Sequence, residues 1–397
     1  MANDGKYKVL VDTLKSAILS GECDLDRPFP SERMLIRKYG HSRITVQQCG
    51  QQTGVRLAPL RFPYVQMTRR QFISGSLASA VLLAHGDVTA SVDEGSPVRF
   101  LVAADIHYRP GVFPFDTDEQ LGKIVARGVL EKVDFGIQLG DFQHDAKRAQ
   151  AFIDLWNDAP FRTCNVIGNH DDDATTPAET RAALRLERGW YRFDVRGVRF
   201  VVLDTNYGFV NGAFVHYGKG CGFSPYKLGA ADRLRLHPDE FPFLEEALGT
   251  ATGPCVIFSH RTLAGEDADA VRVRQIVAAA NRARPGRVAL ALCGHNHCDR
   301  MVRRDGVSFL TVNSPNHVWI PFRHKGYPDE DVRRWREIDH VVAYDGTPLS
   351  AIVTVRADGH FAVRGLTGGF WRGIVPERIS GKLTKRGIAP VIRDYEG

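Results

Sequence analysis

Val98-Arg99-Phe100-Leu101-Val102-Ala103-Ala104-Asp105-Ile106-His107 is an apolar run that ends on two side chains able to bind a metal ion. The run has the length and composition of a buried β-strand. Five such stretches occur in the chain, and four of them follow a β-branched or apolar run. Strands are therefore expected to deliver their polar side chains to a common edge, with enough nitrogen and oxygen donors for two divalent cations. The later stretches are Gly140-Asp141, Gly168-Asn169-His170-Asp171, Phe258-Ser259-His260 and Gly294-His295-Asn296-His297.

Strand-like and helix-like segments alternate through the middle of the chain. Segments typical of helices are Asp118–Val129, Ala146–Trp156 and Phe241–Leu248. Alternation at this spacing predicts a layered α/β domain. A hairpin of Ala351–Val355 and Phe361–Val363 is expected to complete a sheet. The predicted strands are Val98–Ala104, Asp134–Leu139, Cys164–Ile167, Val198–Leu203, Cys255–Phe258, Val288–Cys293 and Ser308–Val312.

The five motifs jointly resemble those of the calcineurin-like metallophosphoesterase superfamily, over residues 99–365. The resemblance implies an α/β (α+β sandwich) fold, with a two-sheet β-sandwich flanked by helices and a two-metal site at the carboxyl ends of the strands. It implies that Asp141 bridges the two metal ions. The other implied ligands are Asp105, His107 and His297 for one metal, and Asn169, His260 and His295 for the other.

The resemblance also implies a reaction. His170 would protonate or steady the leaving group, and Asp171 would orient its imidazole. Two metal ions roughly 3.5–4 Å apart clamp the attacking and leaving oxygens, and a water held between them becomes a nucleophile. We therefore expect a binuclear hydrolase that cleaves a phosphomonoester or phosphodiester by attack of a metal-activated hydroxide. Mn, Fe, Zn and Co all accept these ligands, and the sequence does not choose among them.

Several residues beside the motifs are further candidates. Arg109 and Arg261 lie close in sequence to the ligands, so either they bind substrate phosphate or they are surface residues. Purple acid phosphatases carry a tyrosine at the place of His144, so an Fe(III) centre with that ligand is not expected. His144 and Asp145 either lie near the metals or belong to a solvated loop. The remaining candidates are the pair His317 and Trp319, which is expected to face the cleft, and the inserted loop Tyr207–His237, which is expected to shape the substrate pocket.

Residues 5–48 carry a different pattern. Pro30-Ser31-Glu32-Arg33 and Ser42-Arg43-Ile44-Thr45-Val46 closely resemble the GntR-type winged helix-turn-helix. That resemblance implies DNA contacts. Cys49-Gly50 breaks the third helix, however, and no wing hairpin follows, so the segment has a small core and marginal stability. The alternative is a small helical bundle without a DNA function. The implied DNA contacts are Arg33, Ser42, Arg43 and Thr45.

Residues 67–90 resemble a twin-arginine export signal. Met67-Thr68-Arg69-Arg70-Gln71-Phe72-Ile73 is followed by the short apolar stretch Ser74–Ala84 and the small-residue site Val88-Thr89-Ala90. The apolar stretch is too short for an ordinary transmembrane helix. We hypothesise that residues 1–66 are a truncated regulator fragment joined upstream of an exported enzyme that begins at Met67. The enzyme would be periplasmic if translation starts at Met67 and cytoplasmic if the full chain is made. The alternative interpretation of residues 67–90 is a helical linker between domains.

Composition fits a globular protein. The chain has 397 residues, 43% hydrophobic residues and a net charge of +6, which is compatible with anionic substrates but is no evidence of nucleic-acid binding. Seven cysteines show no paired metal spacing, and those in strand runs are expected to be buried thiols. The expected organisation is a helix-turn-helix segment (1–50), a linker (51–97), the metallophosphoesterase domain (98–370) and a C-terminal extension (371–397).

Two other functions compete with the hydrolase. One is a GntR-type transcription regulator that uses the phosphoesterase fold to sense a phosphorylated ligand, and the missing wing argues against it. The other is a domain that binds ligands without catalysis, and the complete ligand set argues against that.

Overall fold

The computed structural model describes residues 96–223, 235–384 and 386–397, all within the unit formed by residues 93–397. The helix-turn-helix segment, with Arg33, Ser42, Arg43 and Thr45, lies outside the described residues, and so does the twin-arginine pattern. None of the described helices has the length and apolar character needed to cross a membrane.

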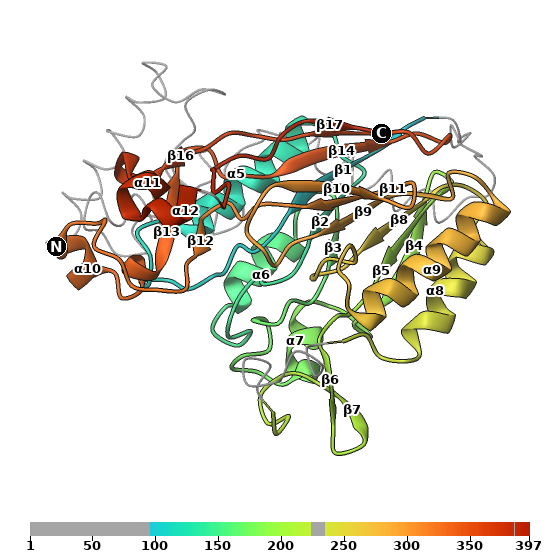
Figure 1. Cartoon of the computed structure of the whole chain (residues 1–397), viewed down its shortest axis with the longest axis horizontal. Helices are drawn as coiled ribbons and strands as arrows, with labels where there is room; N and C mark the ends of the chain where they lie inside the picture. Colours follow the sequence, from blue (N-terminus) through green and yellow to red (C-terminus); the bar gives the residue numbers. More distant parts are fainter. Residues whose placement is uncertain (1–95, 224–234, 385) are drawn as a thin grey trace, which may run out of the picture. The chain divides into compact units, whose positions relative to one another are not determined.

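Two six-stranded sheets form the described domain, as expected for an α/β sandwich (Figure 1). In the first sheet β1, β2 and β3 are parallel, and β14 pairs with β1 in the antiparallel direction. The strand order of this sheet is β17 (Tyr395–Glu396), β15 (Phe361–Arg364), β14 (Ala351–Val355), β1 (Val98–Ala103), β2 (Phe135–Gln138) and β3 (Arg162–Asn165).

The second sheet has a parallel centre and antiparallel edges. Strands β5, β8, β9 and β11 are parallel, whereas β4 and β10 run antiparallel to their neighbours. The order is β10 (Arg300–Arg304), β11 (Val307–Thr311), β9 (Val288–Cys293), β8 (Cys255–Phe258), β5 (Val198–Val202) and β4 (Tyr191–Val195).

Aromatic side chains fill the space between the sheets. Phe100 of β1 stacks on Phe135 of β2 with ring centroids 4.9 Å apart. It meets Phe200 and Phe258 of the second sheet edge-on, at 5.4 and 5.7 Å. All four rings are completely buried. Burial of each such side chain contributes about 1.5–3 kcal/mol, so this cluster fixes the two sheets, and therefore their strand ends, against each other.

Helices cover the outer faces of the sandwich. Helix α5 (Thr117–Leu130) lies on β1, and α6 (Gln150–Asn157) lies beside it on the same face. Helices α8 (Glu240–Gly249) and α9 (Ala268–Ala283) pack together on the second sheet (Figure 1). Asp116 caps α5 and Asp267 caps α9 by accepting backbone N–H bonds in the first turn.

Shorter elements surround the edge of the sheets where the motifs lie. The loop expected at 207–237 begins with the hairpin of β6 (Tyr207–Val210) and β7 (Ala213–His216). A three-stranded sheet consists of β12 (His317–Trp319), β13 (Val341–Asp345) and β16 (Gly369–Phe370). The remaining helices are α7 (Pro177–Ala183), α10 (Asp329–Arg334), η2 (Ile338–His340), η3 (Trp371–Gly373), α11 (Pro376–Ile379) and α12 (Gly381–Thr384).

The C-terminal segment 371–397 is part of the sandwich rather than an appendage. Its strand β17 pairs with β15 at the edge of the first sheet, and Leu383 and Ile392 are buried in the core between the sheets. The polar composition of this segment gives no indication that Leu383 and Ile392 are buried. The expected buried thiols Cys164, Cys255 and Cys293 are confirmed.

Candidate metal centre

The strand ends of both sheets meet at one edge, and each supplies polar side chains there. Asp105 and His107 follow β1, Asp141 follows β2 and Asn169 follows β3. From the second sheet, His260 follows β8, and His295 and His297 follow β9. The carboxyl ends of parallel strands share an edge, which explains why residues so far apart in sequence come together.

The backbone at these residues is unusual. Five of the seven candidate ligands have a positive φ: Asp105 (53°), His107 (52°), Asp141 (50°), His295 (69°) and His297 (47°). Aspartate and histidine tolerate this left-handed region better than most residues, at a cost of order 1 kcal/mol. The backbone bonds Asp105 N–H to Gly140 O (3.0 Å) and His107 N–H to Asp141 O (2.9 Å) hold these turns. The turns aim successive side chains at a common centre.

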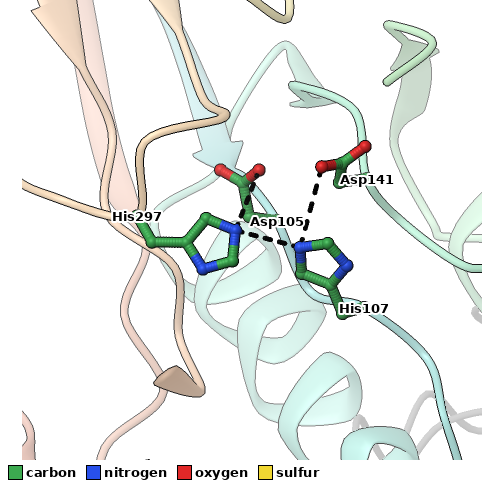
Figure 2. Close-up of side chains that lie close together, drawn as sticks. All are labelled: Asp105, His107, Asp141 and His297. Atoms are coloured by element: carbon green, nitrogen blue, oxygen red, sulfur yellow. Dashed lines mark hydrogen bonds and ion pairs between the residues drawn. The ribbon is translucent and has the colours of Figure 1, made fainter. Parts of the chain in front are cut away.

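A first cluster consists of Asp105, His107, Asp141 and His297, all buried (Figure 2). The Nε2 atoms of His107 and His297 lie 3.0 Å apart. The His297 Nε2 is 3.5 Å from Asp105 Oδ1, and the His107 Nε2 is 3.7 Å from Asp141 Oδ2. Two imidazoles and two carboxylates therefore point their donor atoms at one small volume.

A second cluster consists of Asp141, His260 and His295, with Asn169 beside it. The Nε2 of His260 lies 3.2 Å from Asp141 Oδ2 and 3.2 Å from the Asn169 side-chain oxygen. The His295 Nδ1 lies 3.2 Å from the Nε2 of His260. Because Asp141 belongs to both clusters, the two clusters share one carboxylate.

Backbone carbonyls orient two of the histidine rings. The Nδ1 of His260 lies 2.8 Å from Leu139 O, and the Nδ1 of His297 lies 2.9 Å from His317 O. A carbonyl oxygen only accepts, so each Nδ1 donates and the neutral ring presents its Nε2 lone pair to the cluster. This is the arrangement by which proteins fix histidine ligands.

Electrostatics favours cation binding. Burial lowers the pKa of His107 and His295 well below the ordinary value, and neighbouring histidines lower it further, so both rings are neutral. Burial would raise the pKa of Asp141, but His260 and His170 outweigh it and hold the pKa below its usual range. Burial would lower the pKa of His260, but the Asp141 carboxylate raises it to about 9. A divalent cation replaces the proton of such an ion pair.

The donor set fits two divalent cations. Each cluster offers imidazole nitrogens and carboxylate or amide oxygens, which suit first-row metals. A carboxylate has two oxygens and can serve both ions, which is the position that Asp141 occupies. The structure therefore brings together all seven candidate ligands that the sequence suggested.

The predicted partner of His170 is corrected by the structure. The Asp171 carboxylate is fully buried and accepts backbone N–H bonds from Phe142, Gln143 and Gly168, at 2.8–3.0 Å. It therefore fixes the loops that carry Asp141 and Asn169. The carboxylate that binds the His170 Nδ1 is Asp173, at 2.7 Å. The sequence signal was the run Asp171-Asp172-Asp173, but a run of three aspartates does not say which one faces the histidine.

The two arginine candidates differ. Arg109 forms a bidentate ion pair with Glu337, at 2.6 and 2.7 Å, so its guanidinium is engaged by a carboxylate. Of the two alternatives for Arg109, a phosphate contact or a surface residue, this ion pair favours the second. Arg261 lies near the second cluster, where its charge adds to the burial that lowers the pKa of His295.

Other predicted neighbours do lie at the clusters. The Nε2 of His144 is 2.9 Å from the Nδ1 of His107, whereas Asp145 contacts Arg148 instead. The Trp319 ring lies 4.4 Å from that of His107 and 5.7 Å from that of His170, so it forms one wall of the site. His317 is buried beside Trp319, with ring centroids 4.3 Å apart, and its ring lies 5.6 Å from that of His107 and 5.3 Å from that of His297.

The strand-end site and the two-sheet sandwich define a metal-dependent phosphoesterase. The model of the calcineurin-like phosphoesterase family matches residues 98–299, and the chain belongs to this family. The protein is accordingly a metal-dependent phosphoric ester hydrolase.

Solved structures are similar to this chain at low sequence identity. A dimetal phosphatase from Danio rerio is 14% identical, with a TM-score of 0.50, and the match covers 76% of this chain and 98% of that chain. A purple acid phosphatase from yellow lupin seeds is 12% identical, with a TM-score of 0.39, over 76% of this chain and 55% of that chain. No curated protein is significantly similar in sequence.

Proposed function

We propose that this protein is a binuclear hydrolase that cleaves a phosphomonoester or a phosphodiester. The observation that carries the proposal is the buried carboxylate of Asp141, which lies within 3.7 Å of His107 in one cluster and 3.2 Å of His260 in the other. A single acidic group shared by two histidine-rich clusters suits two cations at short separation.

The residues then have distinct roles. Asp105, His107, Asp141 and His297 would hold one ion, and Asp141, Asn169, His260 and His295 the other. Two divalent cations bound there supply the charge that activates water and stabilises a phosphoryl group in transfer. His170 would donate a proton to the leaving oxygen, and Asp173 would hold its Nδ1.

The neighbouring side chains bear on the substrate. Arg109 is neutralised by Glu337, so Arg261 is the arginine that would contact a substrate phosphate. The Trp319 ring beside His170 would border the leaving group. His144 replaces the tyrosine of purple acid phosphatases, so no phenolate ligand is expected, and Mn, Fe, Zn or Co would serve.

Hydrolysis assays test this proposal. The full-length protein is freed of metal and assayed on p-nitrophenyl phosphate and bis-p-nitrophenyl phosphate, with and without Mn²⁺. Turnover is expected only with metal, and the preferred substrate distinguishes a monoesterase from a diesterase. His170→Ala should lose turnover, whereas His360→Ala, which removes an exposed histidine far along the chain, should not. Equal turnover with and without metal would refute the proposal.

A further inference from the structure

Asp173 joins two histidines that lie outside the two metal clusters. Its Oδ2 is 2.7 Å from the His170 Nδ1 and 3.1 Å from the His144 Nδ1. Its Oδ1 accepts a hydrogen bond from the Tyr217 hydroxyl at 2.9 Å. One carboxylate therefore receives three donors from three separate segments of the chain.

The hydrogen bonds fix the tautomer of each ring in turn. An ionised carboxylate only accepts, so His144 donates from Nδ1 and keeps a lone pair on Nε2 when neutral. The His107 Nδ1, 2.9 Å away, must then donate to this lone pair.

The last ring in the series is a metal ligand of the first cluster. With its proton on Nδ1, His107 presents the Nε2 lone pair toward His297 Nε2 at 3.0 Å and Asp141 Oδ2 at 3.7 Å. Two neutral nitrogens that face each other at this distance repel unless a cation lies between them. The tautomer set from Asp173 is thus the one that a metal ion requires.

Resting on the proposed function, we propose that Asp173 is a positioning residue for both ends of the site: through His144 it orients the metal ligand His107, and directly it orients His170. One carboxylate then controls metal affinity and the alignment of the proton donor together.

The hairpin insertion supports this carboxylate. Tyr217 directly follows β7, and its backbone N–H donates to Asn206 O at 2.7 Å. Lys219 N–H donates to the carbonyls of Asp172 and Thr175, at 3.1 and 3.0 Å. The insertion is therefore tied to the loop that carries Asp173, and its tyrosine restrains the second carboxylate oxygen.

Metal affinity provides a readout that does not depend on turnover. Metal-free full-length protein is titrated with Mn²⁺ by calorimetry, as wild type, Asp173→Asn, His144→Leu and Tyr217→Phe. We expect two ions in each protein, with one site weakened about 10–100-fold in Asp173→Asn and His144→Leu, the usual effect of removing an outer partner of a histidine ligand. Tyr217→Phe should weaken the same site less. Asp145→Asn is the matched control, because that carboxylate contacts only Arg148 among the described residues.

A second readout separates the two effects of Asp173. With saturating Mn²⁺, Asp173→Asn should lower turnover of phenyl phosphate more than that of p-nitrophenyl phosphate, because phenolate needs the proton more. His144→Leu should change this ratio less than Asp173→Asn does, because His170 keeps its hydrogen bond to Asp173 even though the two rings lie 4.8 Å apart. Circular dichroism checks that each variant keeps its fold.

Three outcomes would overturn the proposal. Wild-type affinity at both sites in Asp173→Asn and His144→Leu would remove the link to His107. Binding of three ions by the wild type and two by Asp173→Asn would make His144, His170 and Asp173 a metal site instead. Failure of the wild type to bind any metal would refute the proposed function itself, together with this inference.

Discussion

Gly294→Ala tests the packing around the first metal cluster. A Cβ at Gly294 would lie 2.5 Å from Asp105 Oδ2, 3.1 Å from Ala104 Cβ and 3.2 Å from Asp105 Cγ. To restore a separation of 3.0 Å, below which Cβ contacts are essentially never found, the carboxylate must move by about 0.5 Å. Asp105 is fully buried and both its oxygens accept from His295 N–H at 2.9 Å, so this movement also shifts the loop of the second cluster.

The expected result is a large loss of function with a modest loss of stability. Displacements approaching 1 Å cost roughly 100-fold in rate, so a shift of about half that size should cost about 10-fold or more. Overpacking should lower the free energy of unfolding by about 1–3 kcal/mol. Mn²⁺ affinity from calorimetry and hydrolysis of p-nitrophenyl phosphate measure the first effect, and urea unfolding measures the second.

Gly249→Ala is the matched control. Gly249 is the last residue of α8, and a Cβ there meets nothing within 4 Å. This substitution should leave activity unchanged and leave stability equal or higher by up to about 1 kcal/mol. If Gly294→Ala kept the activity and metal affinity of the wild type, the close approach of Asp105 to this glycine would be wrong.

Three further predictions concern the proton donor, the metals and a buried charge cluster. His170→Ala should lower turnover by about 100-fold or more, more for phenyl phosphate than for p-nitrophenyl phosphate, without changing metal content by elemental analysis; equal losses on both substrates would contradict proton donation. Removing metal with a chelator should lower the midpoint of thermal unfolding, because Asp105 and Asp141 lose their counter-charge. Mn²⁺ at about 100 times Kd should restore about 2.7 kcal/mol of the free energy of unfolding. An unchanged midpoint would contradict binding of metal ions by these carboxylates. Burial raises the pKa of Asp172 to about 7, and Asp204 raises that of His216 to about 9 against the effect of burial. Both folded-state pKa values exceed the unfolded ones, so the stability that these two groups contribute is complete at low pH. The contribution of Asp172 is lost between about pH 4 and 7, and that of His216 between about pH 6.5 and 9, each by at most about 1.4 kcal/mol per pH unit. Urea unfolding of Asp172→Asn should show a flatter profile below pH 7, and an unchanged profile would contradict the assignment.

The convergence of the candidate metal ligands could be predicted from the sequence because each follows a strand whose apolar run can be recognised by itself. The strands β8, β9 and β14 begin and end where their apolar runs do. Once these runs are read as parallel strands, the polar residues after them must share an edge. The predicted strand Cys164–Ile167 was less accurate, since β3 spans Arg162–Asn165, but Asn169 still reaches the cluster.

Contacts between distant segments could not be predicted. Arg109 was a candidate for phosphate binding because it lies close in sequence to the candidate ligands, yet its partner Glu337 lies 228 residues away. The choice between Asp171 and Asp173 depends on the turn after β3, where Asp171 points into the protein and accepts backbone N–H bonds. The C-terminal strand β17 is two residues long and carries no apolar run, so only its pairing with β15 reveals it.

The most direct test of the central claim is anomalous diffraction from crystals of the Mn²⁺-loaded protein. Two anomalous peaks are expected roughly 3.5–4 Å apart, one on each side of the Asp141 carboxylate. The first should be within bonding distance of His107 and His297, and the second within bonding distance of His260 and His295. A single peak at this edge of the sheets, or peaks that Asp141 does not contact, would contradict the shared-carboxylate site.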